Sequence, residues 1–165
     1  MRGDIDSNEF SDWELDRYLN LVDEFGHMLI GVGPDGEDPP FFYTVGLSTQ
    51  DEYGYELAVS GLPVEIGPPL LNGLAAIIKQ RGIIPAEGLL VEGDGTPLRL
   101  HRADPDWPFV KISQYTGLPS PVWQAVWPDV GGRYPGEPGC SLTSRDQADF
   151  GLPYGSGAVS ADSGT

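Results

Sequence analysis

Eight polar residues have side chains that could build a binding or acid-base site. Two are arginines, whose planar guanidinium suits a carboxylate or phosphate, and two are acids, which serve as general acid or base. The set is Tyr43, Thr44, Glu56, Asn72, Arg102, Gln124, Asp129 and Arg133. If the predicted strands assemble in one sheet, several of these side chains are expected to converge on a cleft, with the arginines binding an anion. The alternative is that they bond to buried backbone and to each other, Glu56 with an arginine for example.

Other common sites are not predicted. His27 and His101 are the only histidines and lie on different predicted strands, so a two-histidine metal site would need those strands to meet. Cys140 has no base adjacent in sequence, and Ser60-Gly61 lacks the leading glycine of a hydrolase nucleophile elbow. The glycines form neither of the common phosphate-binding patterns. We therefore predict no metal site and no cofactor.

The segment Pro39 to Leu47 is the centre of the predicted fold. Two prolines lead into its run of aromatic and β-branched residues, which is typical of a buried strand. Phe41, Tyr43 and Val45 are expected to point to one face of the sheet, because side chains alternate along a strand. We expect this strand to lie inside a sheet, with the other segments packed beside it.

The remaining elements follow from periodicity, caps and turns. Further strands are predicted over 27–32, which forms a hairpin with the central strand, and over 56–60, 89–91, 97–102 and 121–127. Helices are predicted over 12–25, from a start between Val64 and Pro69 to about Arg81, and, as a short helix, between an Asp104 N-cap and Tyr115. These elements indicate an α+β fold: a mostly antiparallel sheet of five or six strands with two main helices packed on it.

The length suits one domain. We expect a polar leader over 1–10, a single α+β domain over 11–140, and a flexible tail over 141–165, since glycine and serine are abundant after residue 140.

The chain is strongly acidic, with 9 Lys and Arg against 25 Asp and Glu and a formal charge of −16. From Tyr18 to Ile78 there are nine acids and no Lys or Arg. This charge repels nucleic acid, and it either keeps the protein soluble or forms a surface that docks on a basic protein. A single cysteine and the lack of an apolar run of about 20 residues predict a cytoplasmic protein without a membrane span.

Four ordered motifs resemble one protein family. They are Pro39 to Leu47, Glu56 to Pro63, Leu70 to Asn72 and Gln124 to Asp129. Together they are similar to the bacterial and phage family called domain of unknown function 4262, over about Leu15 to Gly139. The chain departs from that family's usual pattern at His27, Tyr55 and Gly136. The resemblance implies no activity and no catalytic residues.

Two functions follow as expectations. The first is a non-catalytic binding or interaction module that engages a basic protein surface or an anionic small ligand, with a phage or mobile-element protein that blocks a host factor as one variant. The alternative is a small hydrolase-like enzyme that uses Glu56 or Asp129 as acid or base and Arg102 or Arg133 to bind an anion.

Overall fold

The computed structural model describes residues 24, 26–34, 36, 38–92, 95–117 and 119–152. The predicted leader, the helix expected over 12–25 and residues 153–165 lie outside this part of the chain, apart from Glu24. No helix in the described residues is long and apolar enough to cross a lipid bilayer.

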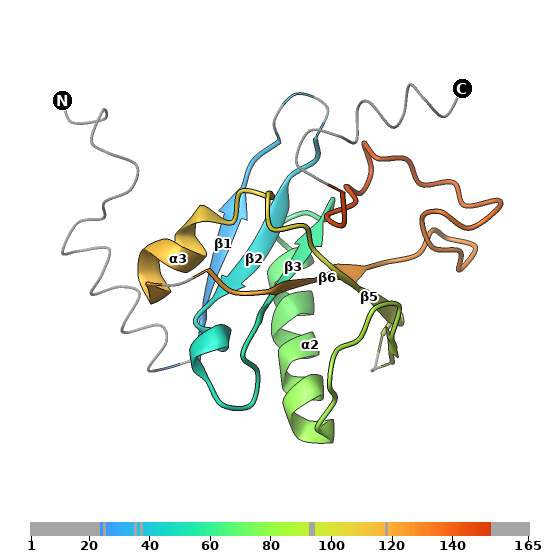
Figure 1. Cartoon of the computed structure of the whole chain (residues 1–165). Coiled ribbons are helices and arrows are strands. Elements are labelled where there is room, and N and C mark those ends of the chain that lie inside the picture. The colour runs from blue at the N-terminus through green and yellow to red at the C-terminus, as the bar shows by residue number, and fades with distance from the viewer. Residues whose placement is uncertain are drawn as a thin grey trace.

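Six strands form one sheet (Figure 1), in the order β1-β2-β3-β6-β5-β4. Their bounds are β1 Met28–Val32, β2 Phe41–Val45, β3 Glu56–Ser60, β4 Leu90–Val91, β5 Leu98–Arg102 and β6 Val122–Val126. All neighbours pair antiparallel except β3 and β6, which are parallel. The predicted α+β class and the mostly antiparallel sheet are confirmed.

The interior position predicted for the aromatic segment is confirmed by β2. It pairs with β1 on one side and with β3 on the other, where Phe41 lies opposite Ser60. Phe41, Tyr43 and Val45 join the hydrophobic cluster on one face, and Phe42 packs against the cluster on the other. Both faces of this strand are covered because its side chains are apolar on both sides.

Helix α2, Gly67–Arg81, covers one face of the sheet. Leu71, Leu74 and Ile78 recur at helical intervals and pack with β3, β5 and β6 side chains in one cluster. Two prolines occupy the first turn, where their missing N–H has no cost, and Gly82 ends the helix with φ 63°.

Helix α3, Val110–Thr116, lies on the opposite face, where Ile112 joins the cluster that contains Phe41 and Tyr43. The expected N-cap at Asp104 is wrong. Asp104 instead forms a turn in which its carboxylate accepts the Asp106 N–H at 2.8 Å. Pro108 disfavours helical geometry at Trp107, and the helix starts at Val110, after Phe109, whose ψ of 57° is not helical.

The folded part extends beyond residue 140, so the boundary expected there is too early. After β6 the chain loops out and returns to the sheet (Figure 1) as residues 146–152, which we call the C-terminal strap. Phe150 is fully buried and packs against Phe41, Trp107 and Phe109. The strap is bound by side chains of β3 and β6, because Ser60 Oγ accepts the Ala148 N–H at 2.8 Å and Gln124 bonds to two strap residues.

Candidate functional site

The eight polar residues singled out from the sequence do not share one cleft. Tyr43, Thr44 and Glu56 lie near the β2–β3 turn, and Asn72 lies on the exposed surface of α2. Asp129 and Arg133 belong to the loop after β6, and Gln124 and Arg102 line two separate cavities. The structure therefore brings one predicted acid and one predicted arginine together, Asp129 and Arg133, through the Arg133 backbone N–H, and it does not gather the eight side chains around one cavity.

Glu56 is bound by backbone N–H groups, not by an arginine. Its carboxylate is fully buried and accepts the N–H groups of residues 46, 47 and 48 at 2.9–3.2 Å, and the Thr44 hydroxyl at 2.7 Å. Burial raises the pKa of Glu56 above its usual value, although these hydrogen bonds act in the opposite direction. Glu56 lines neither of the two cavities described below.

Asp129 organises the loop that follows β6. Its carboxylate accepts the backbone N–H groups of Gly131, Arg133 and Ser141 at 2.8–2.9 Å. These bonds, led by that from Ser141, lower the pKa of Asp129 to about 2. Asp129 thus closes a loop on itself, and like Glu56 it is absent from the walls of both cavities.

The two histidines are also apart. His27 Nε2 lies 2.7 Å from Asn72 Oδ1, at the β1 side of the sheet, whereas His101 lies on β5. Within the described ranges, no group of three His, Cys, Asp or Glu side chains is arranged to hold a metal ion.

The first cavity, which we call the acceptor cleft, has a volume of about 360 Å³. It lies between β5, β6 and the C-terminal strap. Its walls consist of Glu87, His101, Gln124, Val126, Pro135, Gln147, Ala148, Asp149, Gly151 and Leu152. The volume is within the range of small-ligand sites.

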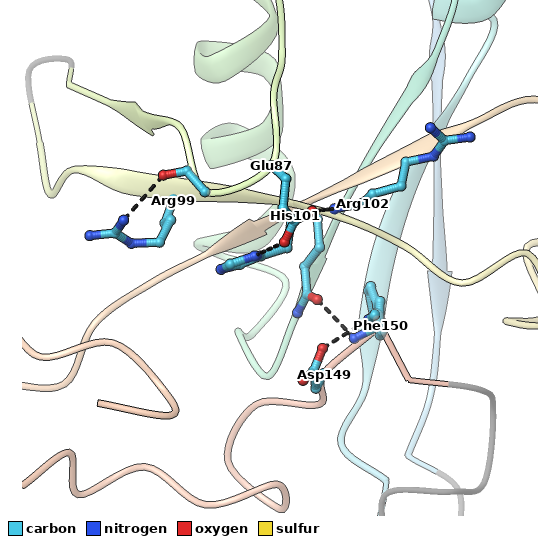
Figure 2. A network of polar contacts seen from close by, with 9 residues as sticks. Glu87, Arg99, His101, Arg102, Asp149 and Phe150 are labelled. Atoms are coloured by element: carbon cyan, nitrogen blue, oxygen red, sulfur yellow. Dashed lines mark hydrogen bonds and ion pairs between the residues drawn. The ribbon is translucent and has the colours of Figure 1, made fainter. Parts of the chain in front are cut away.

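The Glu87 carboxylate fixes one side of this cleft (Figure 2). One oxygen lies 2.5 Å from His101 Nδ1, and the other accepts the Arg102 N–H at 2.8 Å. Burial alone would raise the pKa of Glu87, but the Arg102 N–H and His101 outweigh it and lower the pKa below its usual value. Glu87 is therefore ionised at neutral pH.

The two carboxylates of the acceptor cleft are hydrogen-bond acceptors. In the neutral tautomer that donates from Nδ1 to Glu87, His101 Nε2 carries a lone pair, and no partner for this atom is present in the described residues. Asp149 is exposed, and one of its oxygens accepts the Gly151 N–H. The cleft thus combines two carboxylates and an imidazole.

The amides in the wall are already used for structure. Gln124 donates to the Ala148 carbonyl at 2.7 Å and accepts the Phe150 N–H at 2.8 Å. Gln147 bonds in the same way to both backbone groups of Trp127. One N–H of each amide is therefore used within the protein, and Gln124, predicted as a ligand-binding residue, holds the strap that forms the wall.

Sequence reasoning missed Glu87 and Asp149 and treated His101 as a surface residue. Glu87 lies in the segment 83–89, whose pattern is irregular, and Asp149 lies in the expected tail. The only sequence signal was the alternation of His101 with Leu98 and Leu100, which places it on the face opposite the α2 cluster.

Comparison with known proteins gives one match. The model of the family described as domain of unknown function (DUF4262) matches residues 21–141. No curated protein and no solved structure matches the chain.

Proposed function

Because this chain belongs to the DUF4262 family, whose description assigns no activity, we propose a function from the clefts: the protein is a non-catalytic binding module that receives a basic side chain of a partner protein. The observation that supports this proposal is the acceptor cleft. Its two carboxylates, Glu87 and Asp149, are hydrogen-bond acceptors, so a ligand that supplies hydrogen-bond donors is complementary to them.

A lysine ammonium or an arginine guanidinium meets this requirement, since each consists of donors alone and carries a positive charge. The formal charge of −16 adds a long-range attraction for basic surfaces, which raises association rates more than affinity. Cytoplasmic proteins that bind nucleic acid expose such lysines and arginines, and they are the partner class that we propose.

The test must distinguish binding in the acceptor cleft from a general attraction to the negative charge of the protein. We expect a short lysine-rich peptide to bind, and a Glu87→Gln, Asp149→Asn double variant to bind it about tenfold or more weakly, because hydrogen bonds to charged groups contribute about 1.5–3 kcal/mol each. The matched control is a Glu65→Gln, Asp51→Asn variant, which removes the same charge from exposed positions away from the cleft.

Titration calorimetry or fluorescence anisotropy gives the affinities at low and moderate salt. The same peptide with acetylated lysines should not bind, because acetylation removes the charge. Equal weakening by both double variants would show that the peptide senses only net charge, and the proposal would then fail.

Acid-base chemistry is the second candidate, and one observation favours it. A histidine whose Nδ1 is held by a carboxylate and whose Nε2 faces a cleft has the arrangement of a general base. The base in this version is His101, oriented by Glu87, and the expected Glu56 and Asp129 have no part in it. Hydrolysis of simple aryl esters or phosphate esters that is lost in His101→Gln would support this candidate over the binding module.

A further inference from the structure

The two cavities differ in the charge that their walls can carry. The second cavity lies on the α3 face of the sheet, has a volume of about 440 Å³, and is bordered mainly by apolar residues. Arg102 borders it, but its side chain shares the opposite sheet face with Leu98 and Leu100, which α2 covers. The acceptor cleft has His101 in its wall, and histidine is the side chain that ordinarily changes charge near neutral pH. A response to pH is therefore expected in the acceptor cleft.

His101 and Glu87 form a close pair at the wall of this cleft (Figure 2). His101 Nδ1 lies 2.5 Å from one Glu87 oxygen, and the other oxygen accepts the Arg102 N–H at 2.8 Å. The carboxylate is thus fixed by two neighbouring residues of β5. A neutral imidazole and an imidazolium can both donate a proton from Nδ1 to it. The pair can therefore persist when His101 changes its charge.

Protonation of His101 changes the charge of the whole wall. The residues of the wall include two carboxylates, Glu87 and Asp149, and no Lys or Arg. The wall therefore carries a charge of −2 with a neutral imidazole and −1 with an imidazolium. The imidazolium attracts the Glu87 carboxylate and repels any other cation in the cleft. A lysine or arginine side chain is consequently bound less well once His101 is charged.

The groups around His101 leave it as the side chain that responds between about pH 6 and 8. Its partner in register on β6, Gln124, is uncharged. The charged or titratable neighbours are Glu87 from the segment before β4, Arg99 on the same face of β5, Tyr134, over which Arg99 lies, and Asp149 from the strap. Carboxyl, guanidinium and phenol groups do not ordinarily titrate in this range. The lowered pKa of Glu87, and the pKa of Tyr134, which burial raises, lie further from it.

We propose that His101 is a pH switch in the acceptor cleft, which binds a basic side chain of a partner while the imidazole is neutral and releases it when the imidazole is protonated. This inference rests on the function proposed above, because it requires a basic ligand in the cleft. The ligand and the proton oppose each other, and such a coupling is reciprocal. Binding of the partner must therefore release protons from His101.

The first experiment uses the wild-type protein and a lysine-rich peptide that has no histidine and is capped at both ends, so that its charge is constant from about pH 6 to 8. Titration calorimetry in two buffers of different ionisation enthalpy gives the number of protons exchanged on binding. We expect release of up to about one proton, and an affinity about tenfold lower near pH 6 than near pH 8. Low salt is needed, because the Glu87 side chain is 65% exposed and salt screens exposed charges. Binding without proton release would overturn the switch.

The second experiment uses variants. His101→Gln keeps a polar side chain that cannot become charged, so it should bind the peptide near neutral pH but lose the proton release and most of the pH dependence. The matched control is His27→Gln, because His27 is the other histidine of the chain and lies beside Asn72, at the β1 side of the sheet. This control should behave as wild type. An equal pH dependence in wild type and His101→Gln would overturn the assignment to His101.

The outcomes also distinguish this inference from the proposed function. If the peptide binds near neutral pH, is weakened by the Glu87→Gln, Asp149→Asn double variant, and keeps the same affinity on acidification, the binding module is supported and the switch is wrong. If the peptide does not bind through these carboxylates near neutral pH, both are wrong. Circular dichroism shows whether each variant is folded. Should His101→Gln be unfolded, the proton count of the wild-type protein still decides the question.

Discussion

The Thr44 hydroxyl donates to Glu56 Oε1 at 2.7 Å, and its oxygen accepts the Leu57 N–H at 2.9 Å. The antiparallel register of β2 and β3 ends one step earlier, where Tyr43 pairs with Ala58. The Thr44 side chain therefore replaces a backbone acceptor for the Leu57 N–H, at the point where β2 and β3 separate. The Glu56 carboxylate is bound where these strands separate. Its hydrogen bonds with the N–H groups of residues 46–48 hold the first residues of the 3₁₀ turn η1, Leu47–Thr49.

The burial of Glu56 predicts a pH dependence of stability. Because its pKa is higher in the folded chain than in the unfolded chain, folding is favoured by protonation of this group. Its stabilising contribution is therefore complete below the ordinary value of 4.5 and is lost as the pH rises through the folded-state pKa. We therefore compare the free energies of unfolding of wild type and Glu56→Gln. The wild-type value minus the variant value should increase as the pH falls from neutral to 4.5.

Urea unfolding at a series of pH values measures both proteins. Taking the difference cancels the titration of the remaining acids, provided that the variant keeps the same fold by circular dichroism. A difference that stays constant, or that decreases on acidification, would contradict the raised pKa.

The fold was predictable where local sequence decides it. The strand β2 follows from two prolines and a run of aromatic and β-branched residues, and the α2 face follows from apolar residues at helical spacing. The faces of β6 were also predictable, since Val122 and Ala125 lie in opposite clusters. In each of these elements one sequence periodicity is enough to predict which side chains are buried.

The candidate sites were predictable only in part, because they depend on contacts between distant segments. Arg102 and Gln124 were selected from the sequence and each lines a cleft, but the partner of Gln124 is the strap, which the sequence presented as a glycine-rich tail. Large apolar residues within it, such as Phe150 and Leu152, were the sign that this tail returns to the core. For Glu56, the alternative of bonds to buried backbone describes the structure, because three adjacent backbone N–H groups bind it, and the arginine named as an example of a partner does not.

The close approach of Gly61 to the strap predicts a specific effect of a methyl group. A Cβ at Gly61 would lie 1.9 Å from the Asp146 carbonyl oxygen, so Gly61→Ala must displace the strap. We expect a loss of about 3 kcal/mol in unfolding free energy, from overpacking and from the φ of +85°. Gly54→Ala is the control, because Gly54 has φ +80° and nothing within 4 Å of the added carbon, and it should cost about 1 kcal/mol.

Hydrogen exchange at the Ala148 amide distinguishes strap release from global unfolding. This N–H is bonded to Ser60 Oγ, so it should exchange faster in Gly61→Ala under native conditions and not in Gly54→Ala. Similar exchange in the two variants would show that the strap tolerates the methyl group.

The burial of Phe150 predicts that the strap is part of the domain core. Phe150→Ala removes a ring in contact with Phe41, Trp107 and Phe109, and should lower the unfolding free energy by about 3–5 kcal/mol. The matched control is Leu152→Ala, because Leu152 is a strap residue that is only partly buried and binds Trp107 through its backbone. A loss of less than about 1 kcal/mol for Phe150→Ala would place the strap outside the cooperative core.

The bonds to Asp129 predict the acid stability of the loop over 129–141. Its pKa is lowered from 3.8 to about 2, so its stabilising effect is present above 3.8 and is lost as the pH falls towards 2. Carboxyl-detected NMR should give a titration midpoint near 2 for this residue.

Asp129→Asn replaces one acceptor oxygen by an amide group, and the Ser141 N–H should then exchange faster, at neutral pH as well as at low pH. Arg145→Gln, a substitution at a residue that contributes no bond to Asp129, should leave the Ser141 exchange rate unchanged. A midpoint near 3.8 would mean that the backbone donors do not hold the carboxylate in solution, and the loop would then owe its shape to other contacts.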